Sequence, residues 1–382
     1  MKKALLFALV LTLVLGACSA NRQKLSPQAN LNLKSANVYY QQKDNETSLL
    51  RALDLYERVL SDNPDHVVAL KRSADLNLYF ATKEEPAKAE KDGVVQYMKM
   101  ENAKKVIGLF QITHARYSKV IEVMDTFVKL NDDEKAVRRD SQRKKESSWV
   151  RLFKIGQLQF ENKLYDDAVE TFDIVYNLDT TRQEALRMLV AVYQETGDNE
   201  KFELYMDRVL AVAPDDADMI RLKGAYHYNK KEYAEAAEYF RRTMATNPLD
   251  TNNMLLLSSS YTEQKDYQPA LEILVRVLRL EPENLDVLIS AKDLSAALNN
   301  KTAEIDYWKR ILALDSSVKN LEDFSFRMFY LEEYQTAMPY AEMWYEKDNT
   351  NKLAVSTCIT LANKIGRPDL EKKYSDIYKR LQ

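Results

Sequence analysis

Residues 217–250 read ADMIRLKGAYHYNKKEYAEAAEYFRRTMATNPLD, and residues 251–284 read TNNMLLLSSSYTEQKDYQPALEILVRVLRLEPEN. The two stretches agree at the positions that govern helix packing. Each has a tyrosine, an alanine three residues later and a large apolar residue four residues beyond that: Tyr233, Ala236 and Phe240, then Tyr267, Ala270 and Leu274. Proline recurs every 34 residues, at Pro214, Pro248 and Pro282. Self-similarity at a fixed period of this length predicts a repeat protein.

Each stretch also has the spacing of amphipathic helices. Apolar or small residues recur at i, i+3, i+4 and i+7 in the first half of each unit, as at Met254, Leu257, Ser258 and Tyr261. Gly156 and Gly224 occupy the same slot of two units, so we expect two antiparallel helices to approach most closely there. Proline ends one helix and begins the next, because it fixes φ and has no backbone N–H.

These positions resemble the tetratricopeptide repeat, a helix-turn-helix unit with small, tyrosine, alanine, aromatic and proline residues at fixed places. The resemblance covers residues 149–350 well and residues 29–82 more loosely. It implies an all-α protein, a right-handed α-solenoid of helix-turn-helix repeats. Three residues depart from the pattern, which makes the unit near 285–316 degenerate: Phe202 and Glu304 stand at alanine positions, and Lys292 stands at a small-residue position.

The amino terminus has the features of an export signal. Lys2 and Lys3 precede an apolar stretch, 4–15, that is shorter than the roughly 20 apolar residues of a membrane-spanning helix. The stretch runs into Gly16-Ala17-Cys18, which resembles the lipobox of bacterial lipoproteins. This resemblance implies that Cys18 carries acyl chains as the first residue of the mature protein, and that Ser19 after it directs sorting to the outer membrane. The alternative is a plain secretion signal in which Cys18 has no role.

We therefore expect six segments along the chain. They are a signal peptide (1–17), a lipidated cysteine with a short linker (18–28), N-terminal repeats (29–82), an irregular helical insertion (83–148), a regular repeat array (149–350) and C-terminal capping helices (351–382). The insertion contains a charged run with Arg138, Arg139, Arg143, Lys144 and Lys145. A solvated helix face is the simpler interpretation of this run, and contact with a lipid headgroup or a partner is the alternative.

Composition narrows the classes of function. Seven glycines in 382 residues leave little room for phosphate-binding loops. The leader contains two lysines, so its removal takes the formal net charge from −3 to −5, and a mildly acidic protein has no general attraction for nucleic acid. Lipidation uses Cys18, which leaves Cys358 without a disulfide partner, and its neighbours are typical of a small buried helix residue.

The sequence shows no pattern of a catalytic, metal or cofactor site. His66, His114 and His227 are far apart and lack metal-ligand spacing. His227 falls at a position that is typical of helix packing. There is neither a nucleophile elbow nor a phosphate loop. We therefore expect a protein that is not an enzyme and that needs no cofactor.

The family resemblance does predict a binding surface. The concave face of such a solenoid is lined by the first helix of each repeat, which here supplies Phe153, Gln157, Phe160, Arg187, Gln194, Arg221, Tyr228 and Ser259. Aromatic and arginine side chains are enriched in binding hot spots. Arg187 and Arg221 have equivalent places in adjacent repeats, and we expect both to be exposed and to pair with an acidic group of a partner. Relatives that clamp a C-terminal carboxylate use asparagine where this chain has Gln157 and Ser259, so a clamp of that kind is not supported.

These features together predict a non-catalytic, lipid-anchored scaffold that binds other envelope proteins through its concave groove. Envelope lipoproteins of this layout include pilotins and helical lipoproteins of outer-membrane assembly machines. Such a protein contacts the membrane only through its acyl anchor, at the periplasmic face of the outer membrane, and does not bind nucleic acid. The alternative is a lipoprotein that captures a nutrient or carbohydrate, although three tryptophans and few glycines disfavour it.

Overall fold

The chain forms two compact units in the computed structural model, which describes residues 23–91, 94–127 and 129–381. Unit 1 ends at Pro214 and unit 2 begins at Asp215. The predicted signal peptide (1–17) and the predicted lipidation site, Cys18, lie outside the described residues. None of the helices in the described ranges combines the length and the apolar composition needed to cross a bilayer.

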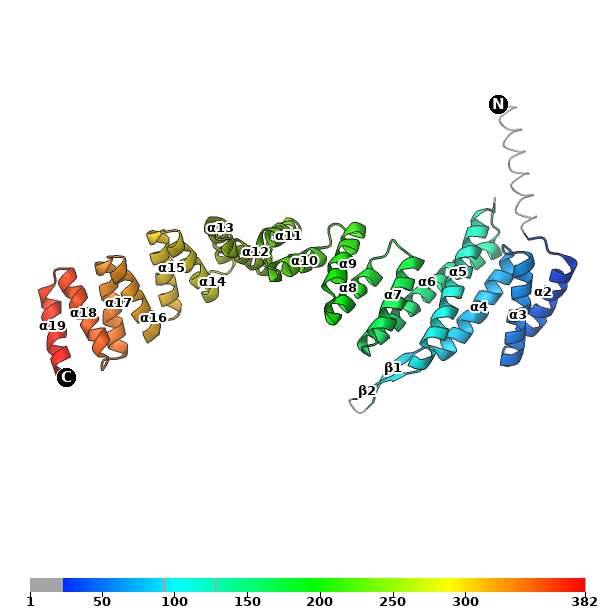
Figure 1. The fold of residues 1–382 in the computed structure, drawn as a ribbon, viewed down its shortest axis with the longest axis horizontal. Coiled ribbons are helices and arrows are strands. Elements are labelled where there is room, and N and C mark those ends of the chain that lie inside the picture. Colours follow the sequence, from blue (N-terminus) through cyan, green and yellow to red (C-terminus); the bar gives the residue numbers. More distant parts are fainter. Residues whose placement is uncertain (1–22, 92–93, 128, 382) are drawn as a thin grey trace, which may run out of the picture. The chain divides into compact units, whose positions relative to one another are not determined.

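Unit 1 is a series of helices that pack against their neighbours along the chain (Figure 1). One hairpin and one short 3₁₀ helix, η1 (Met100–Asn102), interrupt it. The α-helices are α2 (Pro27–Tyr40), α3 (Glu46–Asp62), α4 (Val67–Glu84), α5 (Ala103–Asp125), α6 (Asp132–Glu161), α7 (Tyr165–Leu178), α8 (Glu184–Thr196) and α9 (Asn199–Val212).

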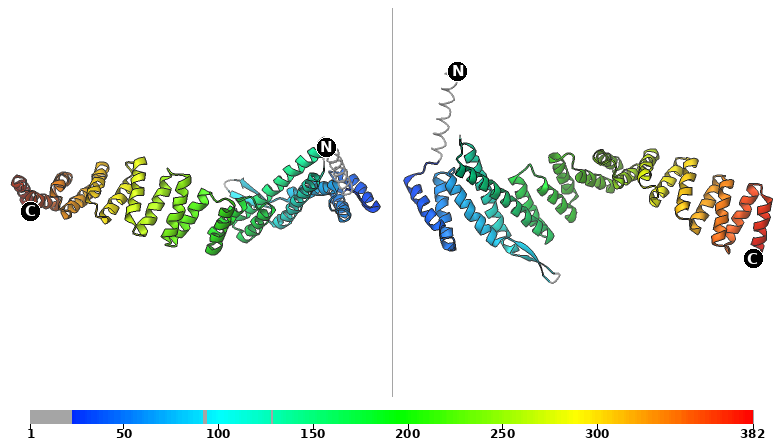
Figure 2. Two further views of the ribbon diagram at one scale, coloured as in Figure 1. Left: turned by 90° about the horizontal axis from the view of Figure 1, so that it is seen from above. Right: turned by 180° about the vertical axis from the view of Figure 1, so that it is seen from behind.

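Unit 2 is a regular stack of antiparallel helix pairs, which the two further views in Figure 2 also show. Its helices are α10 (Ala217–Asn229), α11 (Tyr233–Thr246), α12 (Thr251–Glu263), α13 (Tyr267–Leu280), α14 (Leu285–Ala297), α15 (Lys301–Leu314), α16 (Val318–Tyr330), α17 (Tyr334–Lys347), α18 (Lys352–Lys364) and α19 (Pro368–Arg380). The predicted class, an all-α solenoid of helix-turn-helix repeats, is confirmed by these consecutive packed pairs.

Two repeats have a very close helix contact between a glycine of the first helix and an aromatic ring of the second. Gly156 of α6 faces Phe172 of α7, and Gly224 of α10 faces Phe240 of α11. A β-carbon built on either glycine would lie 2.7 Å from Cε1 of the facing ring. Both rings are fully buried, as are the alanines that the repeat pattern singled out, Ala168, Ala236 and Ala270. The sequence period therefore marks the true helix interface.

The turn between the two helices of a repeat contains one residue in the left-handed region. From α6 onward, the turn residues with positive φ are Lys163, Gly197, Lys231, Lys265, Asn299, Glu332 and Gly366, with φ between 54° and 73°. The first five follow one another at the repeat period. An L-residue with a side chain pays about 1 kcal/mol there, and only two of these turns have glycine, so tertiary packing holds the turn geometry.

The segment between α4 and α5 contains a feature that we did not predict. An antiparallel hairpin is formed by β1 (Ala87–Lys91) and β2 (Val94–Met98), with Ala87 opposite Met98 and Lys91 opposite Val94. A signal for it is present in the sequence, because Asp-Gly at 92–93 is a dipeptide typical of two-residue hairpin turns. The β1 residues themselves, AKAEK, lack the branched and aromatic side chains of ordinary strands.

The charged run forms the first half of α6 and does more than face solvent. Asp75 of α4 accepts hydrogen bonds from Lys144 (2.6 Å), Lys71 (2.9 Å) and the hydroxyl of Tyr117 in α5 (2.7 Å). Asp140 pairs with the same two lysines, at 3.0 and 3.1 Å. Burial opposes ionisation of Asp140, but hydrogen bonds from Lys144 and Lys71 outweigh it and lower its pKa to about 2. The simpler interpretation of the run, a solvated face, is therefore wrong for Lys144, which ties α6 to α4.

The degenerate repeat keeps its packing because each departing side chain has found a partner. The ammonium group of Lys292 lies 4.4 Å from the ring centre of Trp308, and it pairs with Asp293 at 3.0 Å. Glu304 occupies the alanine position of α15 with its side chain 4 % exposed. Two guanidinium nitrogens of Arg327 in α16 donate to this carboxylate. Nε donates to Oε1, and Nη2 donates to Oε2 at 2.8 Å.

This ion pair predicts an asymmetric response to mutation. Arg327→Met leaves the Glu304 carboxylate buried without a counter-charge, so we expect a loss of about 3 kcal/mol in the stability of unit 2. Adding Glu304→Ala removes the stranded charge and restores the repeat's usual alanine, so the double variant should recover most of that loss. Denaturant unfolding of the three proteins measures both effects, and a double variant as unstable as the single one contradicts this account of the repeat.

Candidate partner-binding groove

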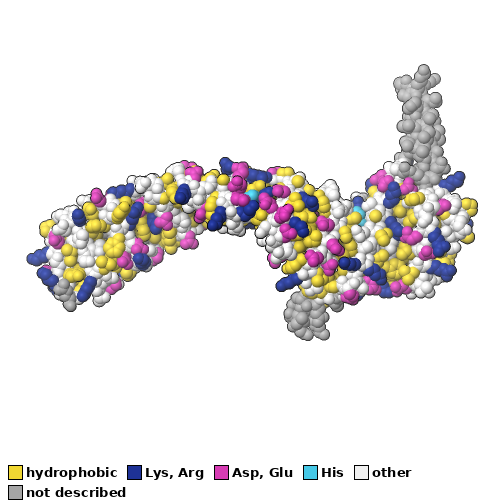
Figure 3. Space-filling view, in the orientation of Figure 1, with side chains coloured by type: hydrophobic (Ala, Val, Ile, Leu, Met, Phe, Trp, Pro, Cys, Tyr) yellow, Lys and Arg dark blue, Asp and Glu magenta, His cyan; other side chains and the backbone are white. Residues whose placement is uncertain are grey.

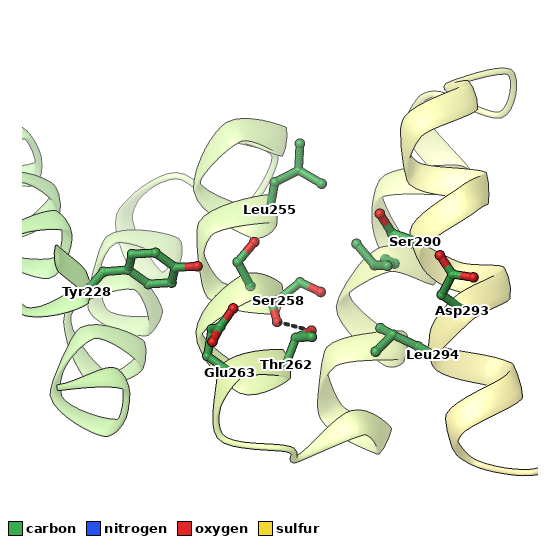
Figure 4. A pocket seen from close by; sticks show the side chains of 10 residues that line it. Tyr228, Leu255, Ser258, Thr262, Glu263, Ser290, Asp293 and Leu294 are labelled. Atoms are coloured by element: carbon green, nitrogen blue, oxygen red, sulfur yellow. Dashed lines mark hydrogen bonds between the residues drawn. The ribbon is translucent and has the colours of Figure 1, made fainter. Parts of the chain in front are cut away.

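A pocket of about 300 Å³ opens between the first helices of three successive repeats in unit 2. Tyr228 enters it from α10, and Leu255, Ser259, Thr262 and Glu263 enter it from α12. The opposite wall is α14, with Ser290, Asp293 and Leu294. Figure 4 shows these side chains from the three helices directed toward one shared space. The repeat period places them there, because it presents the same face of each first helix in turn.

The floor of the pocket is apolar and closed. Leu274 of α13 is 3 % exposed and Leu294 of α14 is 6 % exposed. Ser258 is also buried, and its hydroxyl donates to the carbonyl oxygen of Ala270 at 2.9 Å. The hydroxyl of Thr262 donates to the carbonyl oxygen of Ser258, also at 2.9 Å, which holds that side chain along its own helix. Ser258 and Thr262 are thus fixed by α12 and α13, and the rim above them is what a ligand meets.

The rim has a negative charge from two carboxylates. Glu263 accepts a hydrogen bond from the hydroxyl of Tyr233. The pKa of Tyr233 is raised, mainly by burial and then by the charge of Glu263. The pKa of Tyr228 is raised as well, first by burial and then by the charges of Glu263 and Tyr233. Both tyrosines thus stay neutral and can donate hydrogen bonds. Asp293 has Lys292 beside it, but its side chain is 67 % exposed and remains accessible.

An arrangement of this kind is suited to holding a ligand. Apolar side chains on the floor can receive an apolar group of a few carbons, and the rim supplies two carboxylate acceptors and a tyrosine hydroxyl. A cationic group beside an apolar one satisfies both features, since charge-assisted hydrogen bonds to carboxylates are strong. The tyrosine ring adds contact area that excludes water.

Two of the predicted groove residues of unit 2, Tyr228 and Ser259, line this pocket. Tyr228 is half-buried and packs edge-on against Tyr233 at 5.3 Å between ring centres. Arg221 is exposed, as we expected, and pairs with Asp218 one helical turn away at 3.5 Å. It is not among the residues that line the pocket. The chemistry of this pocket therefore differs from the predicted arginine groove.

Two of the five predicted groove residues of unit 1 are engaged in packing. Phe153 is half-buried, because its ring stacks on Trp149 at 5.4 Å and leans on Phe172 at 5.7 Å. Phe160 is half-buried against Tyr165, at 5.8 Å. Of the remaining three residues, Gln157 and Arg187 are half-buried and Gln194 is exposed. Our expectation that Arg187 is exposed was wrong, because this residue is half-buried.

Sequence reasoning missed the acidic residues of the pocket. Adding one period to Ser259 gives Asp293, so the repeat register alone would have found it. We had not extended the groove positions into α14, since Lys292 and Glu304 made that unit degenerate. The family's groove-lining places include the one directly after Tyr228, and one period later that place is Glu263, so the resemblance could have identified it as well.

Other reactive side chains have packing roles. Cys358 is fully buried in α18, as its neighbours predicted, and burial raises the pKa of its thiol to about 12. His227 is buried and stacks on Tyr239 at 5.2 Å, with Nδ1 at 2.7 Å from Oε2 of Glu232. Within the described ranges, no group of three or more His, Cys, Asp or Glu side chains could hold a metal ion.

The fold thus defines a solenoid of helical repeats with a pocket between successive first helices of unit 2, and comparison with known proteins agrees with this class. Residues 192–250 match the tetratricopeptide repeat family. This match contains α10, α11 and Tyr228 of the pocket. No curated protein matches the chain.

Several solved structures of repeat proteins are similar in fold. The C-terminal part of a repeat-containing protein from Cytophaga hutchinsonii is 16 % identical, with 68 % of this chain and 98 % of that chain covered and a TM-score of 0.44. PilF of Pseudomonas aeruginosa is 16 % identical, with coverage of 54 % and 94 % and a TM-score of 0.36. YrrB, described as a tetratricopeptide-repeat protein with an unusual peptide-binding site, is 15 % identical, with coverage of 44 % and 86 % and a TM-score of 0.38. Likeness at this level concerns the fold alone.

Proposed function

We propose that this protein is a non-catalytic scaffold that binds a segment of a partner protein in the groove of unit 2. The observation that carries the proposal is the pocket between α10, α12 and α14, where an apolar floor lies under a rim of hydrogen-bonding groups. It is open along one side, and its walls belong to helices of successive repeats. A ligand that crosses several repeats is an extended chain segment, which suits a polypeptide.

The rim also indicates which segment binds. Glu263 and Asp293 require a cationic group, and Leu255 and Leu294 require an apolar one. The partner segment therefore has a lysine or arginine close to an apolar residue. This differs from the acidic segment expected when Arg187 and Arg221 were taken as the main contacts.

Peptide binding tests this proposal. A labelled peptide of alternating lysine and leucine should bind the chain, and its glutamate counterpart should bind far more weakly. Glu263→Gln with Asp293→Asn should weaken binding of the lysine peptide by roughly tenfold or more, since each lost contact is a charge-assisted hydrogen bond. Fluorescence anisotropy measures both peptides.

A matched control comes from two exposed acids outside the pocket. Glu272→Gln with Asp286→Asn removes the same charge from α13 and α14, and it should leave binding of the lysine peptide unchanged. Equal affinity for the lysine and glutamate peptides, or equal losses in the two double variants, would overturn the assignment of the groove.

We further propose that the scaffold works at the cell envelope, anchored by acyl chains on Cys18. The support comes from the sequence, in which a basic start, a short apolar core and Gly16-Ala17-Cys18 occur in the order of a lipoprotein signal. Several acyl chains on one residue give stable anchoring, because each buried CH₂ contributes about 0.8 kcal/mol. With Ser19 next to it, the anchor directs the protein to the periplasmic face of the outer membrane, where it serves the assembly or secretion of an envelope machine.

Replacing the acylated residue tests the anchor. Cys18→Ser removes the thiol that receives the lipid, so we expect the protein to leave the membrane fraction or to accumulate in unprocessed form. Membrane fractionation followed by a high-salt wash distinguishes lipid anchoring from charge attraction. Retention of the washed variant in the membrane at the parent's level rules out this anchor.

A further inference from the structure

A second cavity, of about 450 Å³, lies in unit 1 and plays no part in the proposed partner groove. Six of its residues come from α6, namely Arg139, Gln142, Arg143, Lys145, Glu146 and Trp149. His114 of α5 and Asp179, directly after α7, complete it. Three of the eight side chains are cationic, and Trp149 alone is predominantly apolar. This lining differs from the leucine-floored pocket of unit 2, so the two cavities call for different ligands.

The basic residues of α6 fall into two groups according to their partners. Arg138 pairs with Asp125 at 2.7 Å, and Arg143 pairs with Asp140 at 2.8 Å. Lys144 is held between Asp75 and Asp140, as described above. In contrast, Arg139 and Lys145 make no ion pair within the described residues, and both line the cavity. Two cations of α6 that no carboxylate neutralises therefore lie together in the cavity wall.

The two acids of the cavity wall are already occupied. Glu146 accepts from Arg182 at 2.7 Å, and the guanidinium of Arg182 lies on the ring of Trp149 at 3.4 Å. Asp179 accepts from the backbone N–H and the hydroxyl of Thr181, at 3.2 and 2.6 Å. Hydrogen bonding by Thr181 is the main cause that lowers the pKa of Asp179, with smaller contributions from Arg182 and Lys145. Neither acid satisfies Arg139.

A buried histidine provides the independent sign of a ligand. His114 is 5 % exposed, yet its ring has no hydrogen-bond partner among the described residues. Burial, helped by the charge of Lys145, lowers its pKa to about 4, so the ring is neutral at neutral pH and has one N–H to donate. A ring nitrogen without a protein partner is available to a ligand in the cavity. The ring lies in the cavity wall with cationic side chains and the amide of Gln142.

We propose that this cavity binds a phosphate group, with Arg139 and Lys145 supplying the charge and His114 and Gln142 donating further hydrogen bonds. A phosphate monoester has a charge of about −1.5 to −2 at neutral pH and several acceptor oxygens. The two cations can balance this charge, and the four side chains together can donate to these oxygens. Arginine binds phosphate oxygens with two parallel N–H groups, and lysine contributes a compact point charge. The same group occurs on an anionic lipid headgroup and on a soluble phosphate ester, and the cavity offers the same contacts to both.

Calorimetric titration of the full chain with inorganic phosphate, at low salt and neutral pH, tests the site. We expect saturable binding, and Arg139→Gln with Lys145→Gln should weaken it by roughly tenfold or more. The matched control is Lys135→Gln with Arg138→Gln, which removes the same charge from the same helix outside the cavity and should leave the affinity unchanged. Both double variants change exposed or half-buried side chains, and circular dichroism confirms that their helices are intact.

A second titration distinguishes the sources of the phosphate. A short-chain, water-soluble phosphatidic acid that binds more tightly than inorganic phosphate, and loses that affinity in the Arg139–Lys145 variant, assigns the site to a lipid headgroup. Equal affinity for both probes, again lost in that variant, assigns it to soluble phosphate esters. Absence of binding by both probes, or equal affinity of the two double variants, overturns the proposal.

Discussion

The contact between a residue without a side chain and a buried aromatic ring sets the spacing of the repeat. At Gly156 and Gly224 the two helices approach so closely that a single carbon would collide with Phe172 or Phe240. Ala168 and Ala236 of the second helices are fully buried at these close contacts. Interiors packed at this density tolerate added volume poorly. The helix pair is therefore a rigid unit, and its repetition determines which face of each first helix is left to form a groove.

The groove follows from that geometry, but its chemistry does not. Repeat packing consumes one face of α12 through Leu257 and Ser258, and the neighbouring face presents Leu255 and Ser259 to a ligand. Those presented positions are free to vary, so Glu263 and Asp293 can give unit 2 an acidic rim without disturbing the core. In unit 1 the cavity beside α6 has three cationic side chains in its lining instead. Figure 3 shows that basic and acidic side chains are interspersed on the face that it presents. One architecture thus supports two binding chemistries.

The fold could be predicted from the sequence because the period of 34 residues is itself a packing rule. Ala236, Phe240 and Gly224 have the roles that their spacing indicated. The hairpin at 87–98 escaped prediction, since its first strand has the composition of a helix surface. Glu304 and Arg327 lie far apart in sequence, and nothing local indicates that they pair. The repeat register places Tyr228, Ser259 and Glu263 on the groove side of their helices, whereas the surroundings of His114 could be recognised only in three dimensions.

The central claim, that a close glycine–aromatic contact holds the α6–α7 and α10–α11 pairs, is tested most directly by adding one methyl group in unit 1. Gly156→Ala places a carbon against Phe172 and should destabilise the unit by about 1–3 kcal/mol. Gly108→Ala, in α5, meets no atom within 4 Å and should stabilise the same unit by about 0.5–1 kcal/mol. Denaturant unfolding of both variants beside the parent gives the comparison. Opposite signs for the two substitutions are the predicted result, and a Gly156→Ala protein as stable as the Gly108→Ala protein would contradict it.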